Sequence, residues 1–322
     1  MCEPVSWKNN QCIPSKAFRF KMIINRKLLL NLITAFTTIL FSALIPVSVA
    51  HAESTKNISI EPVGYDIING HLDTKNPIEN PNLMEDPGYS RTDSNPGSLP
   101  DSDIATEEKI IKEDNRALIT NTTDTPYRWL GMIDYTTSAN NEGICTGALI
   151  SKDTVLTAGH CVARGNRNFT FTPGRNGNNR PFGTIQVTQV WYDKNFDYIN
   201  NDWGILKLAT PIGDKIGWFG MHVANKTTLF NQYATIAGYP SDKPENTLWK
   251  DKSTIIKMTD KQVYYNTDTY RGQSGAPVLD DKASIYAIHT NGNSQHNWGT
   301  LLTNELFSVV ANISHMTQSS ED

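Results

Sequence analysis

The segment Thr157-Ala158-Gly159-His160-Cys161 places a histidine directly after a short apolar run and beside a cysteine. A second segment, Gly272-Gln273-Ser274-Gly275-Ala276-Pro277, places a serine in a tight turn between two glycines. An imidazole held at the end of a strand suits a general base, because its orientation has to be set before substrate arrives. In the second segment, the backbone N–H groups of Gly272 and Ser274 can converge on a developing oxyanion.

A third segment, residues 201–208, carries Asp202 at the head of an apolar strand. A carboxylate in that place can be held against a histidine N–H, where it selects the tautomer and stabilises the imidazolium. Each segment alone is a weak signal, since G-x-S-G is short and a histidine beside a cysteine is usually just packed. Together, His160, Asp202 and Ser274 predict a catalytic triad.

The chain between these segments alternates short apolar runs with Gly, Pro and Asn, which is typical of an all-β protein. A terminal helix is also expected, because Leu306, Val309, Val310 and Ile313 share one helical face behind Thr303, a suitable N-cap. The predicted strands are Arg128–Tyr135, Thr146–Ile150, Thr154–Thr157, Phe169–Thr172, Thr184–Val190, Gly204–Leu208, Ala234–Ala237, Ala276–Leu279 and Ser284–His289.

Three regions differ in charge: residues 1–52 hold six basic and one acidic side chains, residues 53–108 three and twelve, and residues 109–322 twenty of each. The first region has a basic start, an apolar run from Leu28 to Val49 and a small-x-small site ending at Ala52, so it predicts a signal peptide, with Met22 as a possible true start. The second, rich in Asn, Asp, Ser and Pro, predicts an acidic disordered pro-segment or linker. Residues 109–322 form the predicted catalytic domain.

Export would leave Cys145 and Cys161 as an even pair in an oxidising compartment, which favours one disulfide. A zinc site is disfavoured because further Cys or His residues at ligand spacing are missing around His160. The formal net charge of −4 gives no indication of a polyanion-binding surface. We therefore expect a secreted monomer that needs no metal or cofactor, binds no nucleic acid and keeps no stable membrane association after signal cleavage.

From about Lys109 to about Ile313 the chain resembles the chymotrypsin-fold serine proteases, and more narrowly the bacterial glutamyl endopeptidases of the V8-like group. The resemblance is carried by residues 120–123, 126–128, 157–161, 173–177, 237–240, 268–270, 272–275 and 288–292. It implies two antiparallel six-stranded barrels with a cleft between them, His160 and Asp202 from the first and Ser274 from the second. A Cys145–Cys161 disulfide fits the bridge that pins the histidine loop in that family.

The resemblance further implies an endopeptidase that cuts after Glu, less well after Asp, in peptide or protein substrates with acidic residues. It assigns the specificity pocket to Thr269 and His289, followed by the substrate-lining Thr290 and Gly292. Spacing alone suggests a different outcome, because Asp268 lies six residues before Ser274, where a trypsin-like enzyme attracts Lys or Arg. A third alternative is a protease-fold binding protein without turnover.

Two further expectations concern charge near the pocket. Arg271 stands where the family commonly has Gly, and it is either a solvated rim residue or a cation that attracts acidic substrates. The resemblance also places the start of the mature enzyme at about Lys109, directly after Glu107-Glu108. A Glu-specific enzyme could make that cut itself, and the new α-ammonium would add positive charge near the pocket.

Overall fold

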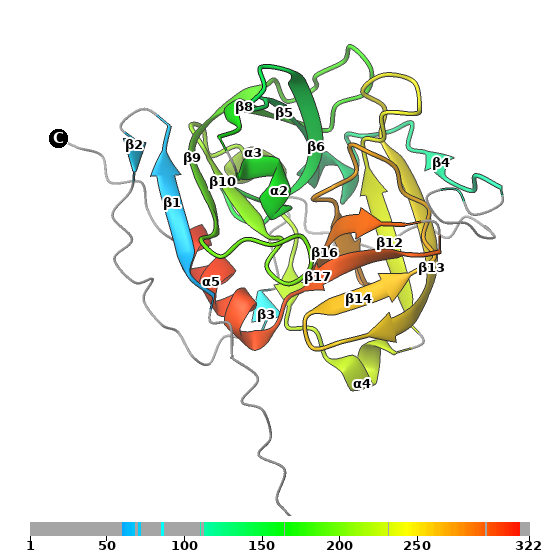
Figure 1. The fold of residues 1–322 in the computed structure, drawn as a ribbon. Coiled ribbons are helices and arrows are strands. Elements are labelled where there is room, and N and C mark those ends of the chain that lie inside the picture. Colours follow the sequence, from blue (N-terminus) through cyan, green and yellow to red (C-terminus); the bar gives the residue numbers. More distant parts are fainter. Residues whose placement is uncertain are drawn as a thin grey trace, which may run out of the picture. The chain divides into compact units, whose positions relative to one another are not determined.

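The computed structural model describes residues 60–67, 70–71, 85–86, 110, 113–163, 165–230, 232–293 and 295–315. All of them belong to one compact unit, Ile58–Asp322. The predicted signal peptide and most of the predicted pro-segment lie outside the described residues. Two six-stranded antiparallel barrels make up most of the described chain, which confirms the predicted all-β fold (Figure 1).

The first barrel follows the order β10-β7-β6-β5-β8-β9 and closes where β9 pairs with β10, with Tyr192 opposite Gly204. Apolar side chains fill its interior, among them Leu130, Ile133 and Phe171, all fully buried. Its strands are β5 (Leu130–Thr136), β6 (Glu142–Leu149), β7 (Thr154–Thr157), β8 (Arg167–Pro173), β9 (Ile185–Asp193) and β10 (Gly204–Leu208).

The second barrel follows the order β15-β12-β13-β14-β17-β16 and closes where β15 pairs with β16, with Pro277 opposite Ile288. Its core is a separate cluster that includes Ile236, Val278 and Tyr286. Its strands are β12 (Tyr233–Gly238), β13 (Trp249–Met258), β14 (Gln262–Tyr265), β15 (Pro277–Leu279), β16 (Ile285–Gly292) and β17 (Asn297–Leu301).

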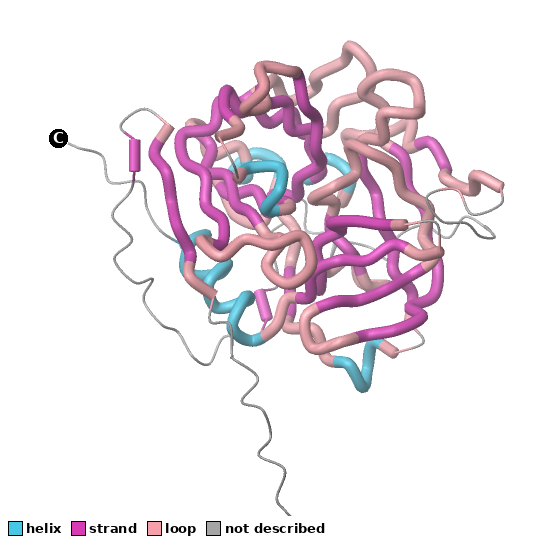
Figure 2. The backbone as a smooth tube through the Cα atoms, in the orientation of Figure 1, coloured by secondary structure: helices cyan, strands magenta, loops and turns pink. Residues whose placement is uncertain are grey.

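Short helices and bridging strands join and flank the barrels, as the backbone trace shows (Figure 2). These elements are η1 (Tyr127–Trp129), α2 (Gly159–Val162), α3 (Gly213–Ile216), α4 (Lys226–Leu229), β4 (Ala117–Leu118) and β11 (Met221–His222).

The predicted C-terminal helix is present as α5 (Asn304–His315). Thr303 caps it, because its Oγ1 accepts the N–H of Leu306 at 3.2 Å. The apolar face of α5, including Phe307, Val310 and Ile313, packs into the same core cluster as the first barrel. At 12 residues α5 is the longest helix of the described chain, and none of the described helices has the length and apolar character needed to cross a membrane.

The structure differs from the sequence expectation inside the acidic segment. Residues expected to be disordered form β1 (Pro62–Asp66), which pairs antiparallel with β9, with Pro62 opposite Asp193 and Asp66 opposite Gln189. β2 (Gly70–His71) pairs with β1, and β3 (Glu85–Asp86) pairs with β11. Backbone hydrogen bonding to an existing strand offsets the ordering entropy that this composition could not offset alone.

Candidate active site

His160 is held by a short connection between two fixed points. β7 ends at Thr157 and α2 begins at Gly159, immediately before His160. Cys161, immediately after His160, is joined to Cys145 of β6 by a disulfide. Thr157 ties the end of β7 to β6, since its Oγ1 donates to the Thr146 carbonyl at 2.9 Å. The imidazole is therefore presented from a rigid corner of the first barrel, with 18% of its side chain exposed.

Asp202 contacts His160 through both of its carboxylate oxygens. Its Oδ1 accepts the backbone N–H of His160 at 2.8 Å, and its Oδ2 lies 2.9 Å from His160 Nδ1. Asp202 is completely buried, and Asn291 Nδ2 donates to the same Oδ2 at 3.4 Å. A buried carboxylate against Nδ1 keeps the proton on that nitrogen and leaves Nε2 free to accept one.

The Ser274 turn depends on its two glycines. Gly272 and Gly275 have φ angles of +97° and +85°, and a Cβ on Gly275 would lie 2.0 Å from Thr157 Oγ1. Only glycine meets both demands without strain. Within the described chain, the N–H groups of Gly272 and Ser274 have no hydrogen-bond acceptor, so both are available to a ligand oxygen.

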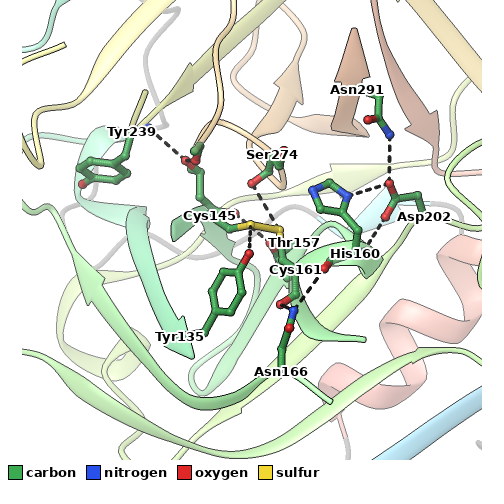
Figure 3. The surroundings of a disulfide bond; sticks show 12 residues. Tyr135, Cys145, Thr157, His160, Cys161, Asn166, Asp202, Tyr239, Ser274 and Asn291 are labelled. Carbon is green, nitrogen blue, oxygen red and sulfur yellow. Dashed lines mark hydrogen bonds and ion pairs between the residues drawn. A yellow bond between two sulfur atoms is a disulfide. The ribbon is translucent and has the colours of Figure 1, made fainter. Parts of the chain in front are cut away.

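The structure brings Ser274 to the His160 corner. Cys161 Sγ lies 3.8 Å from the Ser274 carbonyl oxygen, and that oxygen accepts the N–H of Thr146 at 2.9 Å. In Figure 3 the His160 ring lies between Ser274 and Asp202. No described residue hydrogen-bonds to the Ser274 hydroxyl, which leaves it free to rotate toward the imidazole, a bond that is often loose in unliganded sites.

A cavity of about 170 Å³ opens beside Ser274. All four predicted substrate-binding residues line it, together with Arg271. No aspartate or glutamate is among its described lining residues, which otherwise supply hydroxyl, amide and imidazole groups. The lining consists of Thr269, Tyr270, Arg271, Ser274, His289, Thr290, Asn291, Gly292 and Asn297.

His289 is the buried imidazole of this cavity. It is 4% exposed, and its Nδ1 lies 2.8 Å from the hydroxyl of Tyr265. Burial, followed by the nearby His160, lowers the pKa of His289 to about 3, although a backbone hydrogen bond at Trp298 partly opposes this. Burial raises the pKa of the Tyr265 hydroxyl well above its usual value. Both groups are therefore neutral, and the direction of the hydrogen bond between the Tyr265 hydroxyl and Nδ1 follows from the tautomer that His289 adopts.

Asp268 does not line the cavity. It is completely buried, and its Oδ2 accepts the backbone N–H of Asn115 at 3.2 Å. Burial and the neighbouring Asp251 raise the pKa of Asp268 to about 8, so this carboxyl is mostly neutral at pH 7. The sequence spacing suggested that Asp268 forms a pocket for Lys or Arg. In the structure Asp268 instead contacts Asn115 in the N-terminal segment and does not line the cavity.

Several supporting residues escaped the sequence reasoning. Arg116 is buried, binds Asp114 and Asp242, and reaches Gln273 Oε1 at 3.4 Å, so it holds the residue next to Ser274. Gln273 lies within the predicted motif, and its position between Gly272 and Ser274 is a signal that could have been followed. Tyr265 and Arg116 have no comparable local signal, because long-range packing creates their contacts.

One group of side chains in the described chain could meet a metal ion: Cys145, His160 and Cys161. The two sulfurs are joined in the disulfide, which removes both thiolates, the form of cysteine that binds metals. The residues present therefore do not fit a zinc centre.

The comparisons with known proteins agree with this geometry. A family model described as Trypsin matches residues 119–306. The glutamyl endopeptidase of Bacillus licheniformis is 35% identical over 232 residues, covering 66% of this chain and 71% of that protein. A solved structure of a Glu endopeptidase in complex with MPD superposes with a TM-score of 0.57 at 26% identity, covering 64% of this chain and 100% of that chain.

A further relative carries a different name. The extracellular metalloprotease of Bacillus subtilis is 36% identical over 214 residues, covering 62% of this chain and 68% of that protein. In the present chain the oxidised Cys145–Cys161 pair beside His160 offers no thiolate ligand to a metal ion.

Proposed function

This chain belongs to the trypsin family and is a serine endopeptidase, and on that premise we propose that it cleaves peptide bonds after glutamate, less well after aspartate, with His160, Asp202 and Ser274 as its triad. The observation that carries the proposal is the cavity beside Ser274, which joins a buried histidine to hydroxyl and amide groups and has no acidic residue among its described lining. An anionic side chain fits such a lining better than a cationic one.

The first chemical step is attack of Ser274 Oγ on the scissile carbonyl carbon. His160 Nε2 takes the serine proton and returns it to the leaving amine as the C–N bond breaks, which leaves an acyl-enzyme ester. Water then attacks that ester with the same imidazole as base. Asp202 stabilises the imidazolium through its contacts with His160 at 2.8 and 2.9 Å.

The negative charge of the tetrahedral intermediate falls on the former carbonyl oxygen. The N–H groups of Gly272 and Ser274, which lack acceptors in the described chain, are the predicted donors to that oxygen. The turn is fixed before substrate binds, because Thr146 Oγ1 donates to the Gly272 carbonyl at 2.8 Å and Gly275 N–H donates to the His289 carbonyl at 2.7 Å. The second bond also couples the nucleophile turn to the wall of the cavity.

Glutamate recognition rests on His289 and Thr269. In the tautomer in which Tyr265 donates to Nδ1, His289 can donate its Nε2–H to a substrate carboxylate, and the buried Thr269 hydroxyl can add a second donor. A bound carboxylate also favours protonation of the imidazole, because an opposite charge at close range raises a histidine pKa. Arg271 at the cavity adds positive charge toward the same substrate group.

The enzyme is made for export and activated by cleavage in this proposal. The basic and apolar residues before Ala52 form a signal peptide, and a cut after Glu108 starts the mature chain at about Lys109. Asn115 is anchored to Asp268, and six residues from Lys109 span at most about 20 Å, so the new α-ammonium can reach the neighbourhood of the cavity. N-terminal sequencing of secreted protein that begins far from Lys109 would refute this activation step.

The decisive experiment measures kcat/KM of the purified secreted enzyme on matched peptides with Glu, Asp, Lys, Arg or Phe before the scissile bond. Ser274→Ala is the control, and it has to abolish turnover of every peptide. A preference for Glu supports the proposal, whereas a preference for Lys or Arg would show that Asp268 acts on the substrate after all. Absence of turnover together with failure of Ser274 to react with a phosphonate probe would favour a protease-fold binding protein.

A further inference from the structure

The predicted pro-segment places one strand on the enzyme. β1 extends the first barrel by pairing with the part of β9 that β8 leaves open, since β8 pairs with Ile185 and Gln186 and β1 with residues 189–193. Figure 1 shows β1 lying along β9 near α5. The hydrogen bonding continues beyond the strand at both ends, from Ile67 N to the Thr188 carbonyl and from Lys194 N to the Glu61 carbonyl, each at 2.8 Å.

The side chains at this interface fit closely. Gly64 is opposite Trp191, and a Cβ on Gly64 would lie 2.7 Å from the Trp191 indole. On the other face of β1, the ring of Tyr65 stacks on Tyr192 with centroids 5.9 Å apart. Val63 and Trp191 are only 9% and 5% exposed. β1 is thus built into the barrel surface, with a glycine at the one position where a side chain could not fit.

The start of this segment contacts the region that leads to Asp202. The N–H of Ile60 donates to Glu305 Oε1 of α5 at 2.8 Å, and Ile60 lines a small cavity together with Asn201 and Trp203, the two neighbours of Asp202. None of residues 60–67 lines the cavity beside Ser274. The docked segment therefore packs against the connection that carries Asp202 and leaves the substrate cavity open.

The glutamates around β1 are placed so that cleavage after glutamate would leave this strand intact. The only glutamate within residues 60–67 is Glu61, and it precedes Pro62. A bond to proline is a poor protease substrate, because its nitrogen lacks an N–H and its ring fixes the backbone. The next glutamates along the chain are Glu79 and Glu85, neither followed by proline. Hydrolysis after Glu79 and Glu108, with one water consumed at each bond, would leave β1 intact on a separate fragment.

We propose that β1 stays bound to β9 after the pro-segment is cut, so that the active enzyme is a non-covalent complex of the catalytic domain with a pro-segment fragment ending at Glu79. The fragment is a structural part of the enzyme and does not inhibit it. The position of the cuts rests on the Glu specificity proposed above, whereas the docking of β1 rests on the structure alone.

Docking is tested first in the full chain carrying Ser274→Ala, which cannot process itself. Hydrogen exchange followed by mass spectrometry should show slow exchange for residues 60–67, and Gly64→Val in the same background should abolish it. Glu61→Gln is the matched control: it removes only an exposed ion pair with Lys194, so slow exchange should persist. Slow exchange of β16 in every sample shows that the second barrel remains folded.

Retention is then tested in the active, processed enzyme by native size-exclusion chromatography and mass spectrometry of the protein peak. A fragment ending at Glu79 should coelute with the catalytic domain in equal amount, and Gly64→Val should lose it. Fast exchange of residues 60–67 in the Ser274→Ala chain, or separation of the fragment from the catalytic domain, overturns the proposal. A coeluting fragment that ends at residues other than glutamate upholds the retained strand and refutes the Glu specificity.

Discussion

Tyr265→Phe is the sharpest test of how the cavity recognises an acidic substrate. The substitution removes one oxygen atom from a completely buried ring and leaves its apolar contacts in place. That oxygen lies 2.8 Å from His289 Nδ1, and in the proposed recognition of glutamate it donates to Nδ1 and so keeps the histidine proton on Nε2. Without it, Nδ1 becomes an unpaired acceptor in a buried site.

The cost follows from the two ways in which His289 can respond. If the proton stays on Nε2, the unpaired Nδ1 costs about 1–3 kcal/mol. If the proton moves to Nδ1, the Nε2 lone pair faces the substrate carboxylate and a donor is lost from recognition. The first response lowers stability and leaves binding unchanged, since Nδ1 is unpaired in the free enzyme and in the complex alike. The second weakens binding, because the Nε2–H tautomer has to be restored at a cost of up to the same 1–3 kcal/mol, which corresponds to a roughly 5- to 150-fold fall in kcat/KM. A glutamine substrate is affected less, because its amide can donate to an unprotonated Nε2.

The assay compares kcat/KM for matched peptides with Glu or Gln before the scissile bond, and thermal unfolding is followed in parallel. Tyr264→Phe is the control, since Tyr264 lies on the opposite face of β14 from Tyr265 and its hydroxyl donates to Gln262 Oε1 at 2.5 Å. The Glu-to-Gln ratio should fall in Tyr265→Phe and stay constant in Tyr264→Phe. A ratio within about twofold of the wild type in a folded Tyr265→Phe enzyme would refute the role of Tyr265.

Four further outcomes are expected. Asp202→Asn should lower kcat by about 10³- to 10⁴-fold with an unchanged fold, measured by steady-state kinetics and circular dichroism, because the amide favours the wrong tautomer of the catalytic histidine. The folded wild type keeps the Asp268 proton up to a pKa of about 8, whereas the unfolded carboxyl loses it near pH 4. The free energy of unfolding of the wild type should therefore fall as pH rises from about 4 to about 8. Asp268→Asn lacks this titration, so its stability relative to the wild type should increase across the same window. Urea unfolding at pH 4, 6 and 8 would contradict the buried neutral carboxyl if that difference stayed constant. Arg271→Gly should reduce kcat/KM for Glu peptides by up to about fivefold at low salt and by less at high salt, because salt screens an exposed pair of charges. An identical loss at both salt concentrations would argue against an electrostatic role. Replacing both Cys145 and Cys161 by Ser should lower the free energy of unfolding by about 3 kcal/mol for a loop closed over 16 residues, with denaturant titration as the check and an unchanged midpoint as the contrary result.

The sequence alone was enough for features that depend on neighbouring residues. Gly204–Leu208 is an apolar run interrupted only by Lys207 and forms a strand with the predicted ends, and Thr303 caps the predicted helix. The glycines around Ser274 predict a turn with positive φ, because side chains rarely adopt that conformation. Three strands were missed. In β13, Lys250, Asp251, Lys252 and Lys257 stand among the apolar residues and hide the alternation, and β14 and β17 were missed as well.

Only the tertiary structure decided where distant residues meet. Asp268 has the sequence spacing of a pocket residue, yet its carboxyl accepts the backbone N–H of Asn115, 153 positions away, and does not line the cavity. The sequence likewise shows an acidic, turn-rich segment where the structure places β1, because an edge of β9 supplies the hydrogen bonds that this segment cannot make within itself. Local sequence determined which chemical groups this protein carries and which turns hold them. Long-range packing decided which of those groups face the substrate, since burial and partner contacts arise only when remote segments are brought together.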